Sequence, residues 1–158
     1  MSLGAFDADI PAHALSETSS HAFPRPRTVG GMATVEITTE SFGTTIESND
    51  IVFVDFWASW CQPCVRFAPT YEAASDKHHD VVFGKVDTEA QQQLAAEANI
   101  TSIPTLMAFR EKVLVFAQPG ALSGTDLDKV ITAVKDLDMA EVHSAVAKQQ
   151  AEGAEGAK

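Results

Sequence analysis

Cys61 and Cys64, the only two cysteines of the chain, are the residues whose type and spacing most clearly allow chemistry. They follow an apolar stretch, residues 51–57, that predicts a buried strand, and they open a segment with helical periodicity. Residues i and i+3 of a helix lie on one face, so their Cα atoms should be roughly 5–6 Å apart, which a disulfide can span. The pair therefore indicates a dithiol for reversible thiol–disulfide exchange at the start of a helix.

The two thiols should have different roles. We expect Cys61 at or near the N-cap, where unpaired backbone N–H groups and the helix dipole favour the thiolate and lower its pKa. Because the thiolate is the attacking species, Cys61 is the candidate nucleophile. Cys64 lies one turn deeper and is the candidate resolving thiol. Pro63 fits the first helical turn, where its missing N–H costs little.

Two other roles for the cysteines are weaker. A structural disulfide across so short a loop would add little stability, because little loop-closure entropy is removed. A zinc site needs about four ligands. None of the five histidines forms a ligand-like spacing with the cysteines, and these are His13, His21, His78, His79 and His143. We expect no metal.

The composition limits the possible partners and the compartment. The chain has 158 residues and a formal net charge of −11, which argues against nucleic acid and anionic membrane surfaces as partners. No apolar run is long enough to span a bilayer, and the N-terminus lacks the basic and apolar regions of a secretory signal. We expect a cytoplasmic protein, and a reducing compartment favours a catalytic pair over a structural one.

The hydrophobic pattern predicts a single α/β domain over residues 32–137 with a mixed sheet. We expect residues 1–31 to be a disordered tail, and residues 138–158 to be a helical extension to about residue 150 with a flexible end. Pro69 should kink the helix after Cys61. The expected strands are residues 34–38, 51–57, 81–86, 105–109 and 113–116. The expected helices begin at Thr38 or Thr39, after Cys61, at Ala90, after the N-cap Ser123, and at Met139.

The run V-D-F-W-A-S-W-C-Q-P-C at residues 54–64 closely resembles the active-site segment of thioredoxins. Four later landmarks extend the resemblance over residues 32–137: Pro69, K-V-D at 85–87, S-I-P-T at 102–105 and P-G-A at 119–121. The resemblance implies a thioredoxin-like fold, with a central mixed β-sheet flanked by helices, and a dithiol that reduces disulfides of client proteins. It implies no bound cofactor beyond the redox-active Cys61–Cys64 disulfide. It also implies a flavin-dependent, NADPH-using thioredoxin reductase as electron donor, and we expect a monomer.

The resemblance also assigns roles residue by residue. Cys61 matches the exposed attacking thiol and Cys64 the resolving thiol, while Trp60 matches the aromatic residue that shields the site and docks substrates. Pro104 matches the cis-proline that faces the dithiol. Other residues match supporting positions: Asp55 the buried carboxylate beneath Cys64, Lys85 its neighbour, and Gly120 a glycine that lines the substrate groove.

Physical reasoning supports some of these roles and leaves others open. Asp55 interrupts an apolar strand, and a buried carboxylate there would have a raised pKa and could accept the proton of Cys64, with Lys85 moderating the shift. Strand alternation alone does not reject an outward-facing Asp55, but a functional buried Asp55 is favoured because its strand leads to the dithiol. Most X–Pro bonds are trans, so a cis Pro104 rests on the resemblance. A cis bond would leave the backbone of Ile103 free to pair with an extended substrate.

The sequence departs from the thioredoxin pattern between the cysteines. Gln62 stands where thioredoxins usually have glycine. Together with Pro63 it tunes the pKa of the thiols and the reduction potential, so the direction of electron flow stays open at this point. A general disulfide reductase is our leading hypothesis. A disulfide oxidase or isomerase on the same fold, or a non-catalytic interaction module, remains the alternative.

Overall fold

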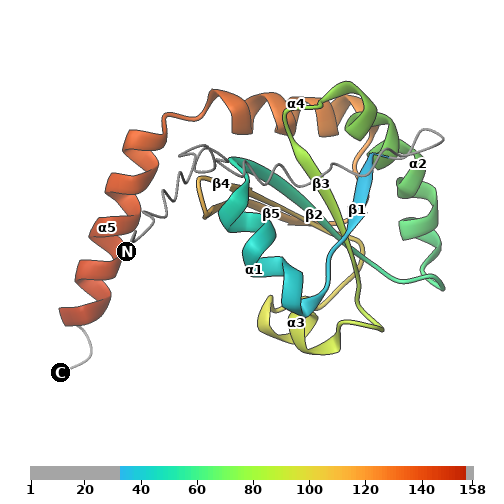
Figure 1. Cartoon of the computed structure of the whole chain (residues 1–158), viewed down its shortest axis with the longest axis horizontal. Coiled ribbons are helices and arrows are strands. Elements are labelled where there is room, and N and C mark those ends of the chain that lie inside the picture. The colour runs from blue at the N-terminus through green and yellow to red at the C-terminus, as the bar shows by residue number, and fades with distance from the viewer. Residues whose placement is uncertain (1–32, 156–158) are drawn as a thin grey trace, which may run out of the picture.

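The computed structural model describes residues 33–155, so the expectations for residues 1–31 and for the last three residues lie outside the described part of the chain. Helices and strands follow one another in the predicted order (Figure 1). In the described part they are β1 (Thr34–Glu36), α1 (Thr39–Ser48), β2 (Ile51–Trp57), α2 (Gln62–Lys77), β3 (Val82–Asp87), α3 (Gln92–Glu97), β4 (Thr105–Arg110), β5 (Val113–Pro119), α4 (Gly124–Asp136) and α5 (Met139–Glu155).

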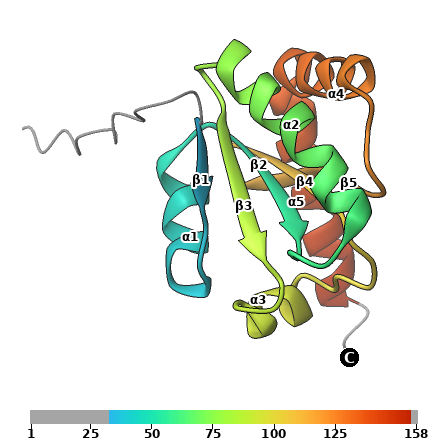
Figure 2. The same cartoon turned by 90° about the vertical axis from the view of Figure 1, so that its right-hand side faces the viewer.

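The five strands form one mixed sheet in the order β1-β3-β2-β4-β5. β1 and β2 run parallel to β3, whereas β4 is antiparallel to both β2 and β5. Helices α2 and α4 pack against one face of this sheet and α1 and α3 against the other. Figure 2 shows α1 and α2 on opposite sides of the strands. The predicted α/β architecture with a mixed sheet flanked by helices is confirmed, and β2, which leads to the cysteines, is its central strand.

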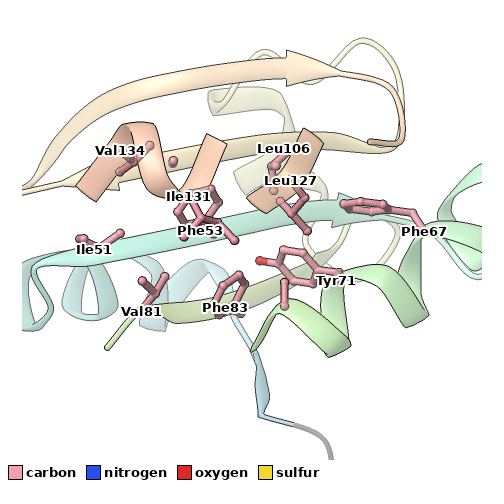
Figure 3. Packing of buried hydrophobic residues seen from close by; sticks show 12 residues of the cluster. Ile51, Phe53, Phe67, Tyr71, Val81, Phe83, Leu106, Leu127, Ile131 and Val134 are labelled. Atoms are coloured by element: carbon pink, nitrogen blue, oxygen red, sulfur yellow. The ribbon is translucent and has the colours of Figure 1, made fainter. Parts of the chain in front are cut away.

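Apolar side chains fill both faces of the sheet. Figure 3 shows the larger cluster, in which Phe53 and Phe83 from the sheet meet Tyr71 of α2 and Leu127 of α4. The Tyr71 hydroxyl donates a hydrogen bond of 2.8 Å to the carbonyl of Gly84. A second cluster on the other face joins the sheet to α1 and α3. Because β2 is buried on both faces, its sequence is an apolar run interrupted only by Asp55 and does not alternate between apolar and polar residues.

Side-chain caps explain where several elements begin. Thr38 is the N-cap of α1 and forms a capping box with Ser41, so the first strand ends at Glu36 rather than at residue 38 as predicted. Ser123 is the predicted N-cap of α4. The third helix was expected from Ala90 but begins at Gln92. The reason is that the Asp87 carboxylate accepts hydrogen bonds from the amides of Glu89 and Ala90, which holds those residues in a turn.

One arginine at the end of β4 binds the C-terminal end of α4. Arg110 Nη1 donates hydrogen bonds of 2.8–2.9 Å to three carbonyls at the end of α4, those of Val134, Lys135 and Leu137. These bonds occupy acceptors that a helix end leaves unpaired. The next helix, α5, extends to Glu155, beyond the expected end near residue 150. Within residues 33–155, none of the helices combines the length and apolar character needed to cross a bilayer.

Candidate active site

The dithiol lies where β2 passes through a short turn into α2. Cys61 is the N-cap of α2, and its Sγ accepts a hydrogen bond of 3.3 Å from the backbone amide of Cys64. Pro63 lies in the first helical turn, where its missing N–H leaves no partner unpaired. Cys61 and Cys64 are joined by a disulfide, with their Cα atoms 5.2 Å apart. The predicted position of the pair at a helix N-terminus is confirmed.

Both cysteines are shielded in this disulfide state. Cys61 is 4% exposed and Cys64 2%, and they pack with Ala58, Trp57 and Ile103. The expectation of an exposed Cys61 is therefore wrong for the oxidised protein. The reason is that each Sγ is bonded to the other while neighbouring loops cover the pair. Gln62 and Pro63, between the cysteines, are exposed, as is Val65 after them.

The cis-proline loop lies against the dithiol, and a second distant loop bonds to the cis-proline. The Ile103–Pro104 peptide bond is cis, and the Ile103 carbonyl oxygen lies 3.7 Å from Cys61 Sγ. Gly120 donates a backbone hydrogen bond of 2.8 Å to the Pro104 carbonyl. Its φ of 99° lies in the left-handed region that favours glycine. The fold thus brings together Cys61, Ile103, Pro104 and Gly120, which are widely separated in sequence.

Asp55 is buried in the core on β2, the strand that leads to the dithiol. It is 1% exposed, and neither carboxylate oxygen has a hydrogen-bond partner. Burial raises its pKa from 3.8 to about 7, and the positive charge of Lys85 opposes part of this rise. The burial excludes an outward-facing Asp55. A carboxyl group with a pKa near neutral can both take up and release a proton at physiological pH.

Lys85 lies beside Asp55 without forming an ion pair with it. The two residues are paired in register across β2 and β3. The Lys85 ammonium lies 4.8 Å from the ring centre of Trp57, an arrangement typical of a cation–π contact. Lys85 therefore acts on Asp55 through its charge and not through a direct hydrogen bond.

Trp60 stands on the rim of the site. Its side chain is 64% exposed, and its indole Nε1 donates a hydrogen bond of 2.6 Å to Oε1 of Glu89. The sequence analysis did not identify Glu89. The available signal was its place two residues after β3, because the carboxyl ends of the parallel strands β2 and β3 lie at the same edge of the sheet.

A groove of about 360 Å³ lies beside Ile103, between the β3–α3 loop and the loop that precedes β4. Hydroxyl, amide and small apolar groups line it, and its lining residues are Thr88, Gln92, Ala95, Ala96, Ile100, Thr101, Ser102 and Ile103. The groove is open at the surface and continuous with the cis-proline loop. Among residues 33–155, no three His, Cys, Asp or Glu side chains are grouped so that they could hold a metal ion.

The arrangement of a helix-capping dithiol, a buried carboxylate and a cis-proline suits thiol–disulfide exchange, and comparison with known proteins agrees. The family model for thioredoxin matches residues 33–133. The chain belongs to the thioredoxin family. It is 56% identical over 120 residues to a putative thioredoxin 2 from Streptomyces coelicolor, a match that covers 76% of this chain and 90% of that protein.

Two further thioredoxin-family proteins extend the comparison. A solved structure of Plasmodium falciparum thioredoxin has a TM-score of 0.59 and 34% identity, and the match covers 63% of this chain and 97% of that one. A bifunctional thioredoxin reductase/thioredoxin from Mycobacterium leprae is 36% identical over 104 residues, which cover 62% of this chain and 23% of that protein.

Proposed function

We propose that this thioredoxin-family protein is a general protein-disulfide reductase that acts through Cys61 and Cys64. The observation that carries the proposal is the place of Cys61 as N-cap of α2, with its sulfur accepting the amide hydrogen of Cys64. The same amide hydrogen bond and the helix N-terminus stabilise a thiolate at Cys61 once the disulfide is reduced.

The reaction proceeds in two exchanges. The Cys61 thiolate attacks one sulfur of a client disulfide, and that bond breaks as the second client sulfur leaves as a thiolate. Cys64 then gives its proton to the Asp55 carboxylate and attacks Cys61 Sγ. The Cys61–Cys64 disulfide forms, the client's remaining sulfur leaves as a thiolate, and the client has gained two electrons.

The surrounding residues hold the client and tune the thiols. The client segment lies against Trp60 and pairs with the backbone of Ile103, which the cis bond to Pro104 leaves accessible. Gly120, which donates to the Pro104 carbonyl, lines the client-binding surface beside the cis-proline. Lys85 tunes Asp55 through its charge. Gln62 and Pro63 lie between the cysteines. They tune the pKa of the thiols and the reduction potential, because they determine the backbone conformation and the solvent exposure around both sulfurs.

We infer the cellular setting from the same family membership. The clients are disulfide-containing proteins. An NADPH-dependent thioredoxin reductase returns the electrons to the oxidised cysteine pair, and the bifunctional thioredoxin reductase/thioredoxin among the relatives supports this choice of electron donor. We propose a cytoplasmic monomer whose catalytic domain spans residues 32–137, with residues 138–158 as a C-terminal extension. The protein carries its two electrons on the reduced Cys61 and Cys64 thiols, gives them up as the Cys61–Cys64 disulfide forms, and needs no bound cofactor.

The reduction potential of the pair tests the direction of electron flow. We expect equilibration against glutathione or dithiothreitol to give a potential below the cytosolic glutathione poise, about −220 to −260 mV by biochemical extraction. A potential well above that range would instead identify an oxidase or isomerase, the alternative that Gln62 between the cysteines keeps open. An inability to form the disulfide would leave the interaction-module role.

Single cysteine variants test the order of steps. Cys61→Ser should abolish turnover of a protein disulfide, whereas Cys64→Ser should trap clients as mixed disulfides that non-reducing electrophoresis detects. Full multiple turnover by Cys64→Ser would contradict the mechanism. Cys61→Ser/Cys64→Ser is the matched control, because an interaction module would retain its binding and function in that double variant.

A further inference from the structure

We propose that Glu89 is a specificity-determining residue that favours clients with a lysine or arginine close to the reacting disulfide. The inference rests on the proposed reductase function and names a property of the client that this function leaves open. It concerns the side of the site formed by Trp60, the β3–α3 loop and the groove beside Ile103.

Glu89 is held against the docking aromatic residue. One carboxylate oxygen, Oε1, accepts the indole hydrogen of Trp60 at 2.6 Å. This bond fixes the carboxylate beside the exposed ring, and the residue itself is exposed. No lysine, arginine or histidine of residues 33–155 lies within ion-pair distance of Glu89. Its charge is therefore available to a bound client.

The loop that carries Glu89 is itself fixed. Asp87 Oδ1 accepts hydrogen bonds from the amides of Glu89 at 2.9 Å and Ala90 at 3.4 Å. The carboxylate of Asp87 is therefore occupied within its own turn. Thr88 anchors the same loop to β2, because both its amide and its hydroxyl donate to the Trp57 carbonyl. Glu89 is thus presented from a rigid support rather than from a free loop.

The charges around the site are one-sided. From Val86 to Phe109, which includes the β3–α3 loop, α3 and the cis-proline loop, the sequence contains three acidic residues and no lysine or arginine. The opposite loop, residues 117–124, contains no charged residue at all. Of these two loops only the one on the Trp60 side carries charged side chains, all of them acidic, and its Glu89 is the one that bonds to the aromatic residue.

A lysine or arginine side chain of a client can contact Glu89 and Trp60 in two ways. Its cationic head can pair with the Glu89 carboxylate, and its aliphatic stem or guanidinium plane can lie on the exposed face of Trp60. Exposed ion pairs of this kind change an equilibrium by about 1.5- to 5-fold, and salt screens them. We expect an effect of that size on kcat/KM, with the larger values at low ionic strength.

Disulfide-linked peptides test the proposal directly. In the series, one residue next to the reacting cysteine is varied among Lys, Gln and Glu, on each side in turn, and kcat/KM for reduction is measured with the full-length protein. We expect the wild-type protein to reduce the Lys peptide about 1.5- to 5-fold better than the Glu peptide at one of these positions. In E89Q, whose amide oxygen can still accept the Trp60 indole hydrogen, that ratio should fall to about one.

A matched control uses Glu97, an exposed acid on α3 that bonds to Gln93 and not to Trp60. E97Q should retain the Lys-to-Glu preference and its loss in 0.5 M salt. A preference that survives E89Q, or an equal loss for all peptides in E89Q, overturns the proposal, since the second result means that Glu89 only orients Trp60. A wild-type protein that reduces every peptide without charge preference also overturns it, whereas one that reduces no peptide refutes the reductase function itself.

Discussion

Replacement of Asp55 by asparagine should change how the stability of the protein depends on pH. Asp55 is almost fully buried, and neither of its oxygens has a hydrogen-bond partner. Asparagine has nearly the same shape and carries no charge, so Asp55→Asn removes only the titration. The change therefore isolates the free energy of ionising a carboxyl group inside the core.

The sign follows from the raised pKa. Well below pH 3.8 the carboxyl group is protonated in both the folded and the unfolded protein, and its burial has no ionisation penalty. As pH rises toward 7, the unfolded chain loses this proton while the folded protein keeps it, so the free energy of unfolding falls. A pKa of about 7 instead of 3.8 corresponds to a loss of about 4 kcal/mol, complete once the pH exceeds 7.

Urea unfolding of the oxidised proteins at a series of pH values between 4 and 8 measures this effect. The stability of Asp55→Asn relative to the wild-type protein should increase by about 4 kcal/mol across that range, with similar m-values for both proteins. Asp76→Asn, at an exposed position of α2, is the matched control and should show no such trend. A constant difference between Asp55→Asn and wild type would refute the raised pKa and, with it, the role of Asp55 as proton acceptor.

Three further substitutions test the packing and capping that support the site, each by urea unfolding of the oxidised protein. Gly84→Ala would place a Cβ against Ile37 Cδ1 and should lower the unfolding free energy by about 1–3 kcal/mol; an unchanged value would mean that Ile37 moves away without cost. Tyr71→Phe leaves the buried Gly84 carbonyl without its side-chain donor and should lower it by about 1 kcal/mol, so equal stability would show that this hydrogen bond adds nothing. Ser123→Ala removes the cap of α4 and should also lower it by about 1 kcal/mol, with Ser123→Asp restoring most of the loss.

The order of elements was predictable because strongly patterned segments dominate this chain. The apolar run of β2, the periodic helix after Cys61 and the Ser123 cap each specify an element through local physics. The boundaries were less predictable, since they depend on partners. β5 continues to Pro119 because it pairs with β4 as far as Thr105, and the third helix starts late because Asp87 binds the preceding amides. Such contacts are not encoded in a local hydrophobic pattern.

The dithiol was evident from sequence because its two members lie three residues apart and act through local helix geometry. The rest of the site was harder to foresee, because it depends on distant loops. The cis bond at Pro104 could be expected only from the family resemblance. The contact between Trp60 and Glu89 spans 29 positions and depends on β2 and β3 ending at the same edge of the sheet.

Asp55 shows why a sequence pattern underdetermines such a site. In a strand buried on both faces, alternation no longer separates inward from outward positions, so a single charged residue is equally compatible with a solvent-facing and a buried place. The helices determine that Asp55 is buried, because α2 and α4 cover the face of the sheet to which Phe53 and Asp55 both belong. The helix that presents Cys61 at its N-terminus is thus also the helix that desolvates Asp55. In this fold, the presentation of Cys61 at a helix N-terminus and the raised pKa of Asp55 are consequences of the same packing.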